Sequence, residues 1–208
     1  MDMKVFKGEI FERVFLDESV DLHLIQEAGS CVKIHLINFS SATNSITIEQ
    51  QGEACTTEIY GLAYIKGDQS VTTETHVTHA VGGGSSNQLI KFVLDDESKG
   101  RFVGDLKIVQ DAQKTEAHQT NRNLLLSETA EMRTQPQSEI YADDVKATHG
   151  ASTGQLDESA LFYMQQRGID KQKARQLLVG AFMREIIVKI PDSAIRDQLL
   201  NAIDGVVE

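Results

Sequence analysis

The stretch with the most side chains suited to chemistry runs from Asp143 to Tyr163 and reads DDVKATHGASTGQLDESALFY. It contains four carboxylates, and its histidine, His149, stands directly before Gly150. An imidazole titrates near neutral pH and can bind a metal ion, so His149 is compatible with proton transfer or metal ligation. A third interpretation stays open, in which His149 is a packed or capping side chain where a strand meets a helix.

A glycine-rich run, GGGSS at residues 82–86, is the second candidate for binding chemistry. A phosphate-binding loop requires a Gly-Lys-Ser/Thr ending and a helix after it. No lysine follows this run, and the next segment has the pattern of a strand. The sequence therefore predicts a flexible turn here.

The remaining histidines and carboxylates do not form a recognisable site. His76 and His79 are three residues apart in a strand pattern, so they point to opposite faces and cannot grip one metal ion together. No Cys/His cluster has the spacing of structural zinc, and we expect no metal site and no catalytic residue. The acidic runs at residues 95–97 and 143–144 fall in expected turns, where solvated carboxylates are ordinary. A carbohydrate-active β-helix enzyme remains an alternative.

Strand patterns dominate residues 1–150. Polar and apolar residues alternate with a period of two, with β-branched enrichment, in six segments: 32–37, 45–50, 58–65, 71–77, 88–94 and 105–109. Strand starts recur at intervals of about 12–15 residues, too short for crossover helices. This spacing leaves a sandwich, a barrel or a β-solenoid. Recurrent Thr, Gln, Asn and Ser, which could stack in ladders on successive coils, and the low aromatic content favour the solenoid.

Residues 151–208 have the pattern of short amphipathic helices. Asp157 is a suitable N-cap, and Gly168 is a suitable left-handed C-cap for the first helix. Asp170 should cap a second helix, and the Pro191-Asp192 pair should end it and begin a third. The predicted organisation is a β-solenoid over residues 1–150, followed by a small helical segment over residues 151–208.

The charge and composition restrict the function. The chain of 208 residues has a net charge of −11, of which the first 150 residues hold −10. An acidic surface disfavours nucleic acid and anionic lipid, and no apolar run is long enough to cross a membrane. We interpret Cys31 and Cys55 as reduced thiols in or near strands, as expected for a cytoplasmic protein.

Several separated motifs resemble one family. Residues 121–169 read NRNLLLSETAEMRTQPQSEIYADDVKATHGASTGQLDESALFYMQQRGI, and they are similar to the SufB/SufD family of iron–sulfur cluster assembly proteins, SufD branch. The upstream stretch at residues 85–126 and the tail ARQLLVGAFMREII at residues 174–187 are similar too. Residues 5–84 match more loosely. Family members carry a further region ahead of the β-helix, whereas here Met1 opens almost directly into strands.

The resemblance implies a right-handed parallel β-helix with helices after it, and a scaffold subunit that is not itself an enzyme. It implies two partners, a SufB paralogue and a SufC-type ATPase that docks on the C-terminal helices. No nucleotide-binding motif is present in the sequence, so ATP hydrolysis would belong to the partner.

The resemblance also gives His149 a role at the interface where clusters are assembled. SufB-type members carry a cysteine on the preceding rung, but residues 128–132 read ETAEM and contain none. Iron–sulfur clusters need about four ligands, mostly thiolates. We therefore expect this chain alone to bind no cluster stably, and the assembled complex to hold one transiently.

Two surfaces are expected to contact partners. The SufC-type ATPase would dock on apolar residues of the helical segment: Leu161, Phe162, Leu177, Leu178, Phe182 and Ile186. In the absence of SufB, the run Glu139, Ile140 and Tyr141 should form the edge of a homodimer. A generic oligomerisation module, without cluster chemistry, is the other alternative.

Overall fold

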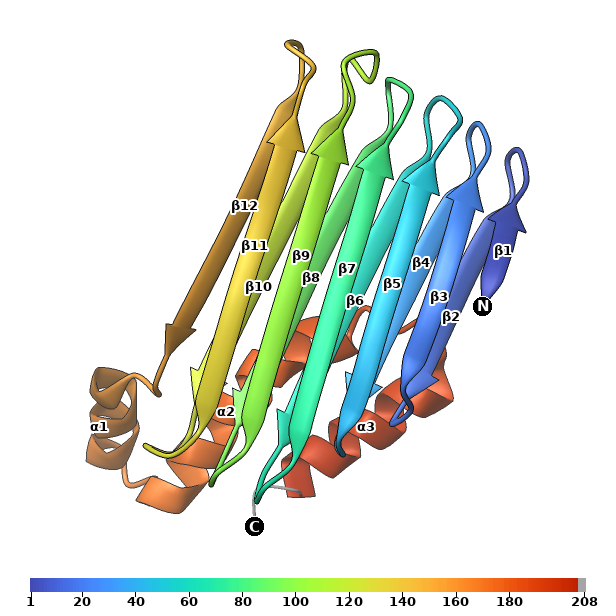
Figure 1. Ribbon diagram of the computed structural model, residues 1–208. Coiled ribbons are helices and arrows are strands. Elements are labelled where there is room, and N and C mark those ends of the chain that lie inside the picture. The colour runs from blue at the N-terminus through green and yellow to red at the C-terminus, as the bar shows by residue number, and fades with distance from the viewer. Residues whose placement is uncertain (206–208) are drawn as a thin grey trace.

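The computed structural model describes residues 1–205 and arranges their twelve strands in two parallel sheets. Successive strands alternate between the sheets (Figure 1). The odd sheet contains, in spatial order, β1 (Asp2–Val5), β3 (Val20–Gln26), β5 (Ala42–Gln50), β7 (Ser70–His79), β9 (Lys99–Ile108) and β11 (Glu131–Ile140). The even sheet contains β2 (Ile10–Leu16), β4 (Cys31–Asn38), β6 (Thr56–Ile65), β8 (Ser85–Leu94), β10 (Glu116–Leu125) and β12 (Lys146–Gly154). Each coil stacks on the one before it, which confirms the predicted parallel β-solenoid.

The main core lies between the two sheets and is filled by their inward side chains. In β4, Val32, Ile34 and Leu36 are at most 1% exposed, which confirms that they share a buried face. Burying each such side chain stabilises the fold by about 1.5–3 kcal/mol. Ile34 pairs in register with Ile59 of β6, so the apolar side chains form columns along the solenoid.

Close packing of neighbouring turns explains the glycine-rich run at residues 82–86. Its three glycines lie in the predicted turn from β7 to β8, and its two serines begin β8. Gly83 has a φ of 72°, a conformation that glycine adopts without strain. A Cβ atom on Gly82 would lie 2.5 Å from the carbonyl oxygen of Gln113 in the next coil. The run therefore serves the stacking of the solenoid.

Three helices follow the solenoid, and their predicted caps are confirmed. They are α1 (Glu158–Gln166), α2 (Lys171–Ile187) and α3 (Ser193–Gly205). The Asp157 side chain accepts hydrogen bonds at the start of α1, and Asp170 accepts one from the backbone N–H of Lys173 at the start of α2. Gly168 has a φ of 83° just beyond α1. None of the helices within residues 1–205 has the length and apolar character of a membrane span.

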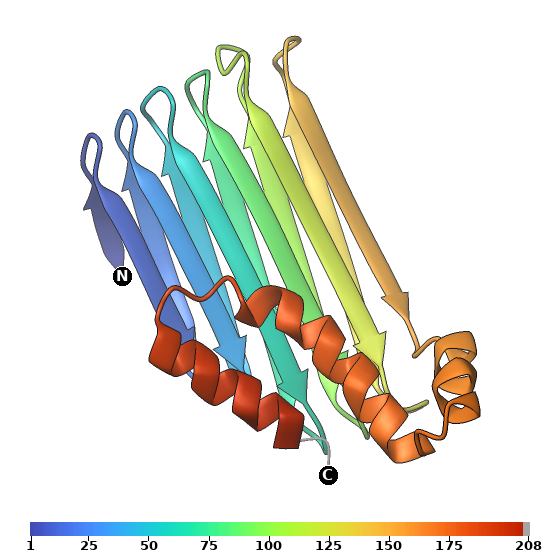
Figure 2. The same ribbon diagram turned by 180° about the vertical axis from the view of Figure 1, so that it is seen from behind.

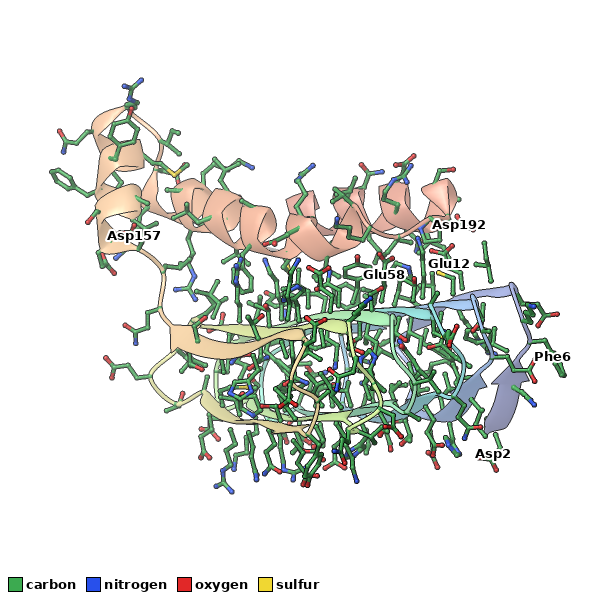
Figure 3. All side chains as sticks on the ribbon, turned by 90° about the horizontal axis from the view of Figure 1, so that it is seen from above. Asp2, Phe6, Glu12, Glu58, Asp157 and Asp192 are labelled. Atoms are coloured by element: carbon green, nitrogen blue, oxygen red, sulfur yellow. The ribbon has the colours of Figure 1, made fainter. Side chains whose placement is uncertain are left out.

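Helices α2 and α3 lie across the outer face of the even sheet, near the carboxyl ends of its strands (Figure 2). Seen from above, the side chains fill the space between the sheets and the space beneath these helices (Figure 3). The second space is a core in its own right, built from Ile37, Tyr60, Leu62, Tyr64, Val93, Leu124, Val179, Met183, Ile186, Ile187, Ile190, Leu199 and Ile203. The helices therefore belong to the packed body of the protein.

Candidate functional site

The end of the solenoid formed by its last coil, β11 and β12, is open, and the first coil, β1 and β2, likewise has one unpaired edge on each strand within residues 1–205. Among the described residues, β11 pairs only with β9, and β12 pairs only with β10. Each strand thus presents one edge of backbone N–H and C=O groups to the outside. The edges are ten and nine residues long and lie at the same end of the molecule (Figure 1).

His149 lies at this open end. It is in the middle of β12, which continues to Gly154, so the strand extends beyond the point where the sequence pattern placed its end. The exposed His149 lines a pocket of about 310 Å³ between β11 and β12. The other lining residues are Leu106, Ser138, Ile140, Ala147 and Thr148. The imidazole is thus the titratable group of this pocket.

A second histidine on the neighbouring strand has a different environment. His118 lies on β10, and its Nδ1 is 2.8 Å from the hydroxyl oxygen of Thr148. Its Nε2 is 3.4 Å from the carboxylate of Glu116. Both ring nitrogens of His118 therefore have local polar neighbours, which makes His118 a useful control for His149.

The predicted dimer edge is at the end of β11 beside this pocket. Ile140 is 43% exposed and Tyr141 is 58% exposed, although the backbone N–H of Tyr141 still bonds to the carbonyl oxygen of Ile108. Glu139 is exposed as well, and its carboxylate accepts a hydrogen bond from the Tyr141 hydroxyl. An apolar and an aromatic side chain are therefore available at an unpaired strand edge.

The thiols of the described chain are far from His149. Cys31 and Cys55 are both free, and β4, which begins at Cys31, is four strand intervals from β12, or about 19 Å. Residue 132, in the stretch where the resemblance would place a cysteine, is a partly buried methionine. Within residues 1–205, no three His, Cys, Asp or Glu side chains are close enough to hold a metal ion.

The acidic run at residues 95–97 supports the structure. The carboxylate of Asp95 is 3.3 Å from the guanidinium of Arg175 on α2. The carboxylate of Asp96 accepts a hydrogen bond from the backbone N–H of Gly67 at 3.0 Å. The two side chains thus tie a helix and a neighbouring turn to the solenoid.

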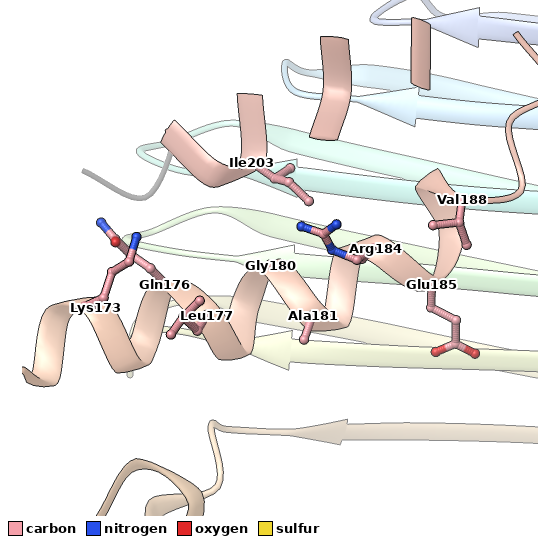
Figure 4. Close-up of a pocket in the computed structure, with 9 residues that line it drawn as sticks. All are labelled: Lys173, Gln176, Leu177, Gly180, Ala181, Arg184, Glu185, Val188 and Ile203. Atoms are coloured by element: carbon pink, nitrogen blue, oxygen red, sulfur yellow. The ribbon is translucent and has the colours of Figure 1, made fainter. Parts of the chain in front are cut away.

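A groove of about 860 Å³ runs between α2 and α3 (Figure 4). Its lining residues are Lys173, Gln176, Leu177, Gly180, Ala181, Arg184, Glu185, Val188 and Ile203. Leu177 is 45% exposed and Val188 is 51% exposed. The groove therefore offers apolar surface beside charged side chains.

The six residues predicted to dock a partner are divided by the fold. Leu177 lines the groove, and Phe162 is exposed on α1. Ile186 and Leu161 are buried, and Leu178 is half-buried. Phe182 packs against the core beneath α2. Leu177 and Phe162 are thus the two with open surface, on different helices.

A buried lysine that was not predicted from the sequence fixes α2 on the even sheet. The Nζ atom of Lys91 donates to the Phe182 carbonyl oxygen at 2.8 Å and to the Glu185 carboxylate at 2.5 Å. It also lies 4.2 Å from the centre of the Phe182 ring. Burial lowers the pKa of Lys91, and the hydrogen bond from Lys91 lowers the pKa of Glu185. The signal was a lysine inside the apolar run QLIKFVL.

The sequence of the chain is similar to those of known proteins. Residues 19–182 match the family model described as SUF system FeS cluster assembly, SufBD core domain. The chain is 35% identical over 183 residues to the iron–sulfur cluster assembly protein SufD of Escherichia coli, covering 88% of this chain and 43% of that protein. It is 38% identical over 162 residues to an iron–sulfur cluster assembly SufBD family protein of Synechocystis, covering 77% and 35%. The SufD protein of Bacillus subtilis is 33% identical over 144 residues, covering 69% and 33%. The chain thus spans less than half the length of these relatives.

Proposed function

The chain belongs to the SufB/SufD family of iron–sulfur cluster assembly proteins, on its SufD branch, and from this premise we propose that it is a non-enzymatic scaffold subunit of a cluster assembly complex. The observation that carries the proposal is the position of His149, in a pocket flanked by two unpaired strand edges. A surface of this kind brings a titratable side chain directly to a protein–protein contact.

The open end is the proposed contact for a SufB paralogue. Backbone groups along β11 and β12 would bond to a strand of the partner, and Ile140 and Tyr141 would be covered by it. When no such partner is present, the same edge should pair with a second copy of this chain, since a two-fold contact is self-complementary.

The groove between α2 and α3 is the proposed dock for a SufC-type ATPase. It combines the exposed apolar residues Leu177 and Val188 with a rim of charged groups. This arrangement of an apolar centre and a polar rim is typical of protein interfaces. ATP hydrolysis would take place on the partner.

His149 would act on the cluster only within the assembled complex. Stable clusters need about four ligands, mostly thiolates, whereas Cys31 begins β4 and Cys55 directly precedes β6, three or more strand intervals from β12. We propose that this chain binds no cluster stably by itself, and that His149 contributes to a cluster held transiently at the SufB contact. The free thiols are consistent with a cytoplasmic setting.

Co-purification with SufB and SufC, expressed together with the tagged full chain, tests the proposal. Ile140→Lys should lower recovery of SufB at least tenfold while SufC is retained, because it places a charge on the strand edge. Leu177→Glu should lower recovery of SufC while SufB is retained. The two variants thus separate the two contacts.

His149→Ala is the test of the site. It should leave both partners bound but reduce the visible absorbance of the cluster assembled on the complex. His118→Ala is the matched control, one strand away, and should leave the absorbance unchanged. Full cluster assembly with His149→Ala would contradict the proposed role, and failure of the wild-type chain to retain either partner would contradict the scaffold function.

A further inference from the structure

One column of paired residues in the even sheet changes character toward the open end. The column begins with Arg13 in the first coil, in β2, and holds Ile34 in β4 and Ile59 in β6. It continues with Gln88 in β8, Gln119 in β10 and His149 in β12, each directly opposite the next. Two amides thus replace two aliphatic side chains on the way from the middle of the solenoid to His149.

The two glutamines of this column are buried with their amides unsatisfied. Gln88 and Gln119 are each 1% exposed, and within residues 1–205 neither the oxygen nor the nitrogen of either amide has a hydrogen-bond partner. The neighbouring inward residues Asn121 and Asn123 bond to each other twice, at 2.7 and 3.0 Å. Buried amides are normally satisfied in this way, so the glutamine column requires an explanation.

The facing sheet leaves room for the side chain of Gln119. A Cβ atom on Gly104, in the facing sheet, would lie 2.4 Å from the amide nitrogen of Gln119 and 2.7 Å from its oxygen. Any side chain at position 104 would therefore collide with this amide. The Gln119 amide thus occupies the space that a side chain at position 104 would need.

We propose that Gln88, Gln119 and His149 form a single hydrogen-bonded ladder, in which Gln119 is the positioning residue for the imidazole of His149. Side chains at paired positions on parallel strands lie about 4.8 Å apart, the spacing at which stacked amides bond to one another. Small rotations about the terminal torsions of the glutamines then satisfy the amides from within the column.

The lower end of the column sets the direction of the ladder. Gln88 is paired in register with Ile59, which has no polar side-chain atom. The Gln88 end of the ladder therefore stays unpaired. An unpaired buried C=O is tolerated more often than an unpaired N–H. The amide of Gln88 therefore donates to the oxygen of Gln119, and the amide of Gln119 donates to a ring nitrogen of His149.

This direction holds His149 as a single neutral tautomer. One ring nitrogen accepts from Gln119, and the other carries the proton and points into the pocket of about 310 Å³. The pocket is thereby prepared for a group that accepts a hydrogen bond. Under the proposed function, the acceptor would be the sulfide of a forming cluster.

Nitrogen-15 NMR of the full chain labelled at its histidines tests the ladder. The His149 signals are assigned by their loss in His149→Ala, and spectra of the wild type and of each variant are recorded at the same pH. The wild-type ring should show two well-separated nitrogen signals, one protonated and one not. Gln119→Met, which keeps the length but removes the amide, should bring them toward the averaged values of a free imidazole. Gln135→Met, an exposed glutamine on β11, is the control and should change nothing.

Either of two results would overturn the ladder. One is a wild-type His149 with averaged ring signals, which decides the matter even if Gln119→Met fails to fold. The other is a folded Gln119→Met variant whose His149 signals match those of the wild type. Neither measurement involves SufB or SufC, so a failed co-purification would contradict the proposed function and leave the ladder standing.

Discussion

The ion pair between Lys91 and Glu185 should respond unequally to the removal of its two partners. The lysine side chain is 2% exposed, whereas the glutamate side chain is 46% exposed. Arg122 also lies 3.5 Å from the carboxylate of Glu185, so the glutamate retains a cation when the lysine is lost. Lys91 has no second carboxylate beside it, because its other neighbours are the carbonyl oxygen and the ring of Phe182.

The expected magnitudes follow from this asymmetry. Lys91→Met keeps the volume and removes a buried charge, an exchange that is often neutral or stabilising by about 1–4 kcal/mol. Glu185→Gln leaves a buried ammonium without its counter-charge, and we expect a loss of about 1–3 kcal/mol. Lys91→Ala removes three methylene groups from the packed interface, at about 0.8 kcal/mol each, for a loss of about 2–3 kcal/mol.

Urea unfolding of the full chain at pH 7, followed by circular dichroism, gives these differences directly. Amide hydrogen exchange over residues 171–187 reports whether α2 itself loosens. Lys33→Met is the control, since Lys33 forms a half-exposed pair with Glu58 at 3.2 Å and should change stability by less than about 0.5 kcal/mol. The reasoning is wrong if Glu185→Gln is tolerated and Lys91→Met is strongly destabilising.

The Lys91–Glu185 pair predicts that the stability of the fold depends on pH in two ranges, one alkaline and one acid. Burial holds the pKa of Lys91 below its ordinary value of 10.5, so the folded chain binds fewer protons and stability should rise as pH climbs through the window ending at 10.5. Lys91 holds the pKa of Glu185 below its ordinary value of 4.5. That contribution is present above pH 4.5 and is lost as pH falls through the folded pKa. Lys91→Met should remove the first dependence and weaken the second.

Three further predictions concern other parts of the fold. Burial lowers the pKa of His79 to about 4, so stability should fall by about 3 kcal/mol between pH 6.5 and pH 4 as the unfolded chain takes up a proton, and His79→Gln should remove this loss in urea titrations. Gly82→Ala should cost about 1–3 kcal/mol in thermal or urea unfolding, because its Cβ would meet the backbone of the next coil, whereas Gly154→Ala has nothing within 4 Å and should be neutral. Light scattering of the isolated chain at micromolar concentration should give a dimer mass that Ile140→Lys reduces to a monomer, and a monomer for the unmutated chain would refute the edge contact.

The strands of the middle coils could be predicted from sequence because one face of each is strongly apolar. Val32, Ile34 and Leu36 alternate with polar residues, and this period of two belongs to a strand with one buried face. The helix caps at Asp157 and Asp170 could be predicted for a similarly local reason, since a carboxylate bonds to N–H groups within three residues. Local chemistry was sufficient in both cases.

The burial of α2 could not be predicted from the helix alone. Its apolar stripe contains Ile186, and the sequence does not say whether such a stripe meets a partner or the protein's own sheet. The decisive residues, Tyr60, Leu62 and Tyr64, lie on β6, more than 100 residues earlier. The run EIYGLAYI did carry a signal, because a nearly continuous apolar strand is typical of a sheet covered on both faces.

The glutamine column could not be predicted from the alternation of polar and apolar residues. Alternation places Gln88 and Gln119 at positions where Ile34 and Ile59 stand in earlier coils, and nothing local explains a buried amide there. A sequence that follows the packing rules in one coil and breaks them in the next is under a second constraint. In this column the buried amides occupy β8 and β10, the two strands before His149 in the even sheet. The polar character of this column is therefore better explained by the demands of the open end than by the stability of the solenoid.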